Sequence, residues 1–206
     1  VDEGVSGKSF DFNGLVPMPA ELRGTSSPTR IQTQEEIDKQ WAEYNQKKAD
    51  GTLNEWQIRD GKPFGVGITQ ERSNELFAKY GANNWYDWAH NNWGTKWDFG
   101  NEFDKLPEIT QEGDLYTVNL SFDTAWSPPI EAYRKLEEQG FVIHAMYDEE
   151  STTFCGEYIT GQGENTIAMV FDSEWAEQNV PQHIDEAFGI VDRIRQYEED
   201  FLVYEE

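Results

Sequence analysis

The chain has few of the residues that most often mark a chemical site. Its 206 residues include one cysteine, three histidines and 16 lysines and arginines, against 40 aspartates and glutamates. The single cysteine, Cys155, excludes an internal disulfide and favours a reducing cytosol. No stretch is long and apolar enough for a membrane span or a secretory signal. The scarcity of basic residues argues against direct binding to nucleic acid or to an anionic membrane, both of which need clustered lysine and arginine.

The bulk composition is that of a folded chain with an aromatic core. A length of 206 residues suits one large domain or two small ones. The hydrophobic content of 37% is low and the aromatic content of 14% is high, so the core must depend on tryptophan, phenylalanine and tyrosine. The chain opens with Val1 rather than Met, as expected of a processed product, a trimmed sequence or a piece whose start is missing.

The negative charge is concentrated in the second half. Residues 1–103 have a net charge of -5, from 16 acidic and 11 basic residues, whereas residues 104–206 have -19, from 24 and 5. Such self-repulsion destabilises a compact state unless it serves a partner. We interpret it either as a solubilising surface or as a surface that binds a basic protein, in the extreme by imitating a nucleic-acid backbone. The predicted partner-binding residues are Asp148, Glu149, Glu150, Glu174, Glu177, Glu198, Glu199 and Asp200.

Tryptophan is concentrated in the segment NNWYDWAHNNWGTKWDF, residues 83–99. Four indoles in so short a stretch, Trp85, Trp88, Trp93 and Trp97, organise a core or form an aromatic anchor for a partner. Trp85 and Trp88 are three residues apart and Trp93 lies about two turns after Trp85, so a helix places most of them on one face. We expect Trp85, Trp88 and Trp97 to be mostly buried and to join the two halves. Trp126, at the end of a predicted strand, belongs to the same core-or-anchor set.

Periodicity and capping residues predict an α+β protein. Thr33 with Glu36 forms a capping box for a helix that ends near Gly51. Further helices are expected at 69–81, 84–94, 127–140 and 181–201, and strands at 95–99, 115–123, 141–148, 152–160 and 165–171, with a polar loop at 103–114. We therefore predict a helical, tryptophan-rich region over 1–94. A ferredoxin-like region follows over 95–206, with helices on one face of an antiparallel sheet and an acidic C-terminal helix. The two regions can also form one continuous domain.

Candidate catalytic and metal-binding residues are sparse. His144 and Cys155 are expected to face one another across a hairpin, with Glu157 or Asp148 nearby, but two ligands without CxxC or HxxxH spacing do not make a zinc site. We therefore expect no tightly bound transition metal, no cofactor and no catalytic residue. A concave site that joined Asp123, His144 and Trp126 would instead favour an enzyme.

Four separate motifs resemble one family. They are FDFNGLVPMPAEL, NNWYDWAHNNWGTKWD, FDTAWSPP and FCGEY, which occur in this order between Phe10 and Phe171. Together they resemble the Api-type (YubB-like) proteins with a ferredoxin-like domain, which are encoded by bacteriophages, plasmids and related mobile elements. The resemblance implies a ferredoxin-like fold, the host bacterial cytoplasm and a mobile-element origin. It implies no activity, because the function of that family is unknown.

The function that these observations favour is a non-enzymatic one. We expect an acidic interaction protein of a bacteriophage or mobile element that binds a basic host protein or a nucleic-acid-binding complex. Such a protein would act as a nucleic-acid mimic or a counter-defence inhibitor. The alternatives are a carboxylate-based enzyme, with or without a metal, and an accessory structural protein. The sequence does not identify the partner, the host or the oligomeric state.

Overall fold

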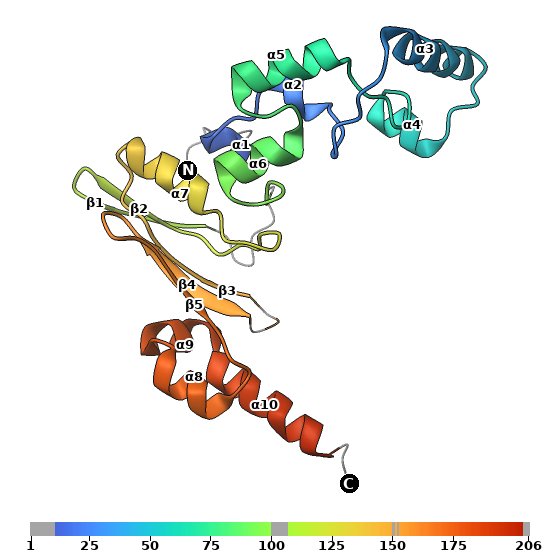
Figure 1. Cartoon of the computed structure of the whole chain (residues 1–206). Helices are drawn as coiled ribbons and strands as arrows, with labels where there is room; N and C mark the ends of the chain where they lie inside the picture. The colour runs from blue at the N-terminus through green and yellow to red at the C-terminus, as the bar shows by residue number, and fades with distance from the viewer. Residues whose placement is uncertain (1–10, 100–106, 150, 152, 204–206) are drawn as a thin grey trace. The chain divides into compact units, whose positions relative to one another are not determined.

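The computed structural model describes residues 11–99, 107–149, 151 and 153–203, and the side chains up to residue 200. The chain divides into two compact units. Unit 1 comprises residues 1–92 and 96–101, and unit 2 comprises residues 93–95 and 102–206. The architecture is mixed helix and sheet, which confirms the α+β prediction (Figure 1). The predicted division into domains near residue 94 stays a prediction.

Ten helices and five strands occur in the described residues. The helices are α1 Phe12–Leu15, α2 Ala20–Arg23, α3 Gln34–Ala49, α4 Glu55–Asp60, α5 Gln70–Tyr80, α6 Trp85–Trp93, α7 Ile130–Glu138, α8 Ser173–Asn179, α9 Gln182–Phe188 and α10 Ile190–Val203. The strands are β1 Glu108–Glu112, β2 Leu115–Asn119, β3 His144–Asp148, β4 Phe154–Ile159 and β5 Gly163–Ala168. None of these helices is both long and apolar enough to cross a membrane.

Helix starts in unit 1 follow the predicted caps. The capping box at α3 is present, since the Thr33 hydroxyl accepts from the Glu36 amide and the Glu36 carboxylate accepts from the Thr33 amide. Thr69 caps α5 by accepting from the amide of Arg72, and Asn84 caps α6 by accepting from the amide of Asp87. Each cap satisfies an amide that the helix itself leaves without a partner.

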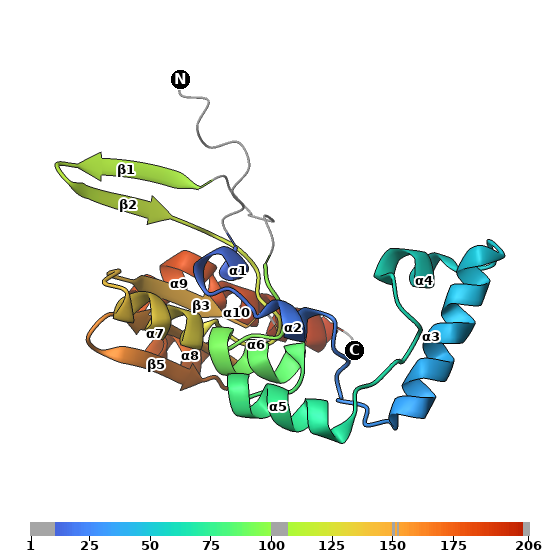
Figure 2. The ribbon, with the colours of Figure 1, turned by 90° about the horizontal axis from the view of Figure 1, so that it is seen from above.

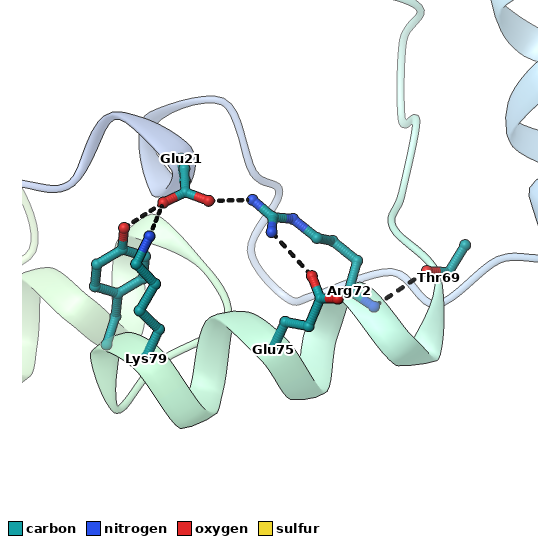
Figure 3. A network of polar contacts seen from close by, with 6 residues as sticks. Glu21, Thr69, Arg72, Glu75 and Lys79 are labelled. Carbon is teal, nitrogen blue, oxygen red and sulfur yellow. Dashed lines mark hydrogen bonds and ion pairs between the residues drawn. The ribbon is translucent and has the colours of Figure 1, made fainter.

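An ionic cluster around Glu21 ties α2 to α5 within unit 1 (Figure 3). The Glu21 carboxylate receives hydrogen bonds from Arg72 Nη2 at 2.6 Å, from Lys79 Nζ at 2.7 Å and from the Tyr80 hydroxyl. These contacts, that of Lys79 first and those of Tyr80 and Arg72 next, lower the pKa of Glu21 to about 2. The Glu21 carboxylate therefore stays ionised at pH values at which an isolated glutamate would already be protonated.

The three-stranded sheet of unit 2 is covered on both faces. Strand β4 lies between β3 and β5 and is antiparallel to both. Its alternation sends Cys155 to one face and Tyr158 to the other. Cys155 packs into an apolar cluster with buried residues of α8, α9 and α10, and Figure 1 shows these three helices together beside the sheet. On the opposite face, the Tyr158 ring lies 5.5 Å from that of Tyr133 on α7.

Two hydrogen bonds to Glu137 on α7 also fasten this helix to the hairpin. The Tyr158 hydroxyl donates to Glu137 Oε2 at 2.5 Å, and the Gly161 amide donates to Glu137 Oε1 at 3.0 Å. Burial and this carboxylate raise the pKa of Tyr158 to about 12, so the phenol keeps the proton that it donates. The predicted helix at 127–140 and hairpin at 141–160 therefore form one packed unit.

The ferredoxin-like sheet is not confirmed. Strand β2 pairs only with β1 among the described residues, and Figure 2 shows these two strands as a ribbon separate from β3–β5. The prediction that the strand at 115–123 joins the main sheet is therefore not borne out in the described residues. Its predicted alternation is present, because Val118 pairs with Ile109 and Tyr116 with Gln111 on one face. Every residue of β1 and β2 is exposed, so neither face of this ribbon is buried among the described residues.

Three further predicted elements differ from the structure. Residues 95–99 form no strand, since the stretch contains bends and irregular backbone. Part of the predicted polar loop at 103–114 is strand β1, whose polar residues fit an exposed ribbon. The helix predicted at 181–201 is two helices, because Gly189 adopts φ 62° and ends α9 in a left-handed cap. Helix α8 was not predicted.

The tryptophans separate into buried and exposed residues. Trp88 and Trp93 on α6 are 5% and 4% exposed, as a core requires. Trp85 is half-buried, and Trp97 is 50% exposed, so the prediction that Trp97 is mostly buried was wrong. The helical spacing that aligns Trp85, Trp88 and Trp93 ends at Gly94, whose φ of 84° turns the chain before Trp97.

Substitution of Trp88 tests its assignment to the core. We expect Trp88→Ala to lower the free energy of unfolding by about 3–5 kcal/mol, because a large buried side chain leaves a cavity. Trp97→Ala is the matched control and should cost well under half of this, because half of its surface already contacts water. Chemical denaturation of both variants measures the difference. Equal losses would contradict the assignment.

The Glu21 cluster predicts a pH dependence of stability. The folded-state pKa of about 2 lies below the ordinary value of 4.5, so the contribution is full above pH 4.5 and disappears as the pH falls towards 2. We expect Glu21→Gln to lower the melting temperature at pH 7, and the difference from wild type to shrink between pH 4.5 and 2. Glu43→Gln on α3 is an exposed control without this network. A pH-independent difference would contradict the ionic origin.

Candidate functional site

Two histidines and a glutamate meet on the face of the unit 2 sheet that α8, α9 and α10 cover. His144 Nε2 lies 3.1 Å from Glu157 Oε2, and His183 Nε2 lies 3.1 Å from the same oxygen. The three donor atoms all lie within 4.8 Å of one another. The histidine side chains are 57% and 51% exposed, whereas Glu157 is 13% exposed. The carboxylate is therefore the inner member and the imidazoles are open to solvent.

The strand register and a short helix bring these residues together. His144 pairs with Ile159 across the hairpin, so Glu157 is its diagonal neighbour on the same face. Helix α9 contributes His183 from beyond the sheet, and the neighbouring Ile184 is fully buried in the apolar cluster. His183 was not predicted as a member of this site because it is 26 residues from Glu157 and on another element. No local spacing motif could have identified it.

The cluster keeps Glu157 ionised. Partial burial of the carboxyl group acts to raise its pKa, but the hydrogen bonds from His183 and His144 outweigh this effect, and the pKa of Glu157 is lowered. The result is an anionic oxygen that two imidazole nitrogens approach from different elements. Such a group can hold protons between the imidazoles, or hold a cation in their place.

The predicted pairing of His144 with Cys155 is wrong. The register places Cys155 opposite Asp148, four residues from His144 along the strand. Cys155 is fully buried, and burial raises the pKa of its thiol to about 11. The side chain is thus a neutral, apolar group in the helix-packed core at neutral pH. It contributes packing to unit 2 and no ligand atom.

The alternative site that would join Asp123, His144 and Trp126 is not assembled. No hydrogen bond or ring contact connects these three side chains in the parts of the chain that the structure describes, and the His144 ring instead lies 6.5 Å from that of His183. Asp123 and Trp126 are both exposed on the segment that precedes α7.

Trp126 occupies an unusual position in its own right. It is 79% exposed and has φ 68°, a left-handed conformation that costs a non-glycine residue roughly 1–2 kcal/mol. Its neighbours hold it there. Thr95 Oγ1 donates to the Ala125 carbonyl at 3.1 Å, and Ser127 Oγ donates to the Gly94 carbonyl at 2.6 Å. The loop therefore presents a large aromatic side chain to solvent in a fixed, strained backbone conformation.

The predicted acidic surface divides into structural and free carboxylates. Asp148 is not a surface residue, because its side chain is 5% exposed and lies 2.7 Å from Arg193. Glu198 accepts from the Ser173 amide and hydroxyl, which joins α10 to the start of α8. Glu149 accepts from the Thr153 hydroxyl at 2.8 Å, and this bond lowers the pKa of Glu149. Asp148 and Glu198 therefore join separate elements of the fold, whereas Glu149 makes a local bond within the β3–β4 turn.

The remaining predicted carboxylates lie on α8 and α10. Glu177 is paired with Arg195, whereas Glu174, Glu199 and Asp200 are exposed and form no ion pair with any described residue. Glu150 lies outside the described residues. The segment from Asp172 to Asp200 contains nine acidic residues and two arginines, and both arginines are already paired within the unit. Its outward charge is strongly negative.

Unit 1 contains a shallow hollow on the surface of α5 and α6. The buried Nε2 atom of His90 has no hydrogen-bond partner among the described residues, and the His90 ring stacks edge-on to Tyr86 at 4.5 Å. The group of metal-binding side chains that the described residues bring together, His144, Glu157 and His183, lies elsewhere, so this hollow carries no metal-site proposal. It is lined by Phe77, Gly81, Tyr86, Asp87, His90 and Asn91.

Comparisons with known proteins leave the family open. No protein-family model matches the chain, and neither the curated proteins nor the solved structures contain a significant match. The resemblance to Api-type proteins therefore stays an expectation from four sequence motifs.

Proposed function

We propose that the chain is a non-enzymatic interaction protein, and that the exposed faces of α8 and α10 bind a basic protein partner. The observation that carries this proposal is the charge of the segment 172–200. Its two arginines are paired internally, and Glu174, Glu199 and Asp200 are left for an external cation. A surface of this kind raises the association rate of a positively charged partner and repels nucleic acid and anionic lipid.

An exposed aromatic anchor supports a protein partner over a diffuse cloud of counterions. Interface energy is concentrated in a few aromatic residues, tryptophan above all. Trp126 has the geometry of such a residue, because the loop holds it outward at a cost in backbone strain. Its backbone is already fixed, so little conformational entropy would be lost when a partner closes over the indole.

The wider proposal is a bacteriophage or mobile-element protein of the host cytoplasm. The mobile-element origin and the cytoplasmic setting rest on the resemblance to Api-type proteins alone. In this setting a basic partner would be a nucleic-acid-handling or defence protein, which the acidic surface would occupy in place of a nucleic-acid backbone. No specific observation favours the enzyme or the accessory structural protein over this function.

Charge reversal on α10 tests the acidic surface. We expect Glu199→Lys with Asp200→Lys to weaken capture of the partner from host lysate, and capture by the wild type to weaken steeply as salt rises, because exposed charges are screened beyond about 8 Å at physiological ionic strength. The readout is quantitative mass spectrometry of captured proteins across a salt series.

The matched control reverses two exposed acids on α3. Asp38→Lys with Glu43→Lys changes the net charge by the same amount, and Asp38 resembles Asp200 in accepting a hydrogen bond from a glutamine four residues earlier. A partner lost from both double variants alike would indicate only a net-charge effect. Capture that is indifferent to salt and to either reversal would leave the acidic surface as a solubilising coat.

Removal of the indole tests the anchor. We expect Trp126→Ala to keep the melting temperature of the wild type and to reduce partner capture by roughly tenfold or more, as loss of an interface hot spot does. Trp97→Ala is the control, because Trp97 is also an exposed tryptophan but lies on ordinary backbone. If Trp126→Ala captures as much partner as the wild type does, Trp126 is not part of the interface.

A further inference from the structure

The His144–Glu157–His183 cluster supports an inference that is independent of the acidic surface. We propose that it binds one divalent transition metal ion, zinc in the cell, through Nε2 of both histidines and the Glu157 carboxylate. Two imidazoles and one carboxylate are a ligand set found in zinc sites that keep an open fourth position for water. Imidazole ligands favour zinc, copper or nickel over magnesium and calcium, which prefer all-oxygen sites.

The geometry is close to that of a coordination sphere. Both Nε2 atoms lie 3.1 Å from Oε2, and no two donor atoms are more than 4.8 Å apart. Tetrahedral zinc with bonds of about 2.0–2.1 Å holds its ligand atoms roughly 3.4 Å apart. The imidazoles need only small side-chain rotations to reach this spacing, and their exposure leaves them free to rotate.

The electrostatic setting also favours a cation. Glu157 is anionic, and both imidazoles direct Nε2 to the same oxygen, where without a metal at least one must donate a proton. A zinc ion replaces that proton and satisfies all three atoms at once. The net charge of -24 raises the local concentration of cations around the whole chain.

Such a site would fasten α9 to the sheet. Its ligands come from β3, β4 and α9, so one ion would connect the β3–β4 hairpin to a helix that follows only after β5 and α8. The earlier expectation of no tightly bound transition metal rested on His144 and Cys155, whereas the site uses neither that pair nor a thiol. Two of the three ligand side chains, those of His144 and His183, are half exposed to solvent. An ion bound there can therefore exchange with ions in solution.

Zinc titration of the full chain tests the site. The protein is stripped with a chelator and titrated with zinc chloride at pH 7.5 by calorimetry. We expect one equivalent to bind, with affinity reduced by roughly tenfold or more in His144→Ala and in His183→Ala, since each removes one of three ligand atoms.

Two control variants distinguish the site from the general acidity of the chain. Glu186→Gln removes an exposed carboxylate from the same helix as His183, and His90→Asn removes the one histidine outside the cluster. Both should bind zinc as the wild type does. In imidazole NMR spectra, zinc should shift the signals of His144 and His183 and leave those of His90 in place.

The proposal fails on any of three results. These are less than one equivalent of bound zinc, equal affinity in the two cluster variants and the wild type, or several weak equivalents that calcium displaces. Circular dichroism of each variant without metal checks that the fold is intact, which the exposure of both imidazoles leads us to expect. None of these measurements depends on the partner, so the metal site and the acidic binding surface are tested independently.

Discussion

The two-sided character of strand β4 is the constraint on which unit 2 depends. Its alternate residues serve different layers, with Cys155 and Glu157 towards α8–α10 and Tyr158 towards α7. Gly156 lies between them because a Cβ there would be 2.4 Å from the carbonyl oxygen of Asn165. A shift of one residue in register would exchange the two faces and separate every one of these contacts.

Polar contacts border the apolar cluster on the face that α8, α9 and α10 cover. Asp148 on β3 pairs with Arg193 on α10, and Glu157 on β4 meets His183 on α9. Between these contacts lie Cys155 and the isoleucines of the helices. Hydrophobic packing alone is nondirectional, so these polar ties select one angle and one register for the helices. The acidic composition of unit 2 thus has a structural part as well as an exposed one.

Sequence reasoning was most reliable where the cause of structure is local. The capping residues Thr33, Thr69 and Asn84 begin helices as predicted, and the hairpin of β3 and β4 follows its alternation. These signals involve neighbours within a few residues. The break at Gly189 was missed because a single glycine inside an apolar, helical pattern is compatible with either a continuous helix or a cap.

Contacts between residues far apart in the sequence could not be predicted, because they depend on how the elements pack. Nothing in the spacing of His144, Glu157 and His183 indicates that they meet, because the meeting depends on a register and on how α9 packs. The exposure of Trp97 and the burial of Asp148 likewise follow from tertiary structure. Composition alone therefore overstated the acidic surface and gave no indication of the histidine cluster.

The left-handed turn at Gly189 has a consequence for the order in which unit 2 comes apart. It divides what would be one long helix into α9, with seven residues, and α10, with fourteen. A seven-residue helix has little stability of its own in water, so α9 depends on tertiary contacts, chiefly those of the fully buried Ile184. Helix α10 keeps its own anchors, Ile190 and Ile194, on the far side of the turn. Opening of α9 as a separate unit would then expose the edge of the core while the rest of the helical layer stays in place.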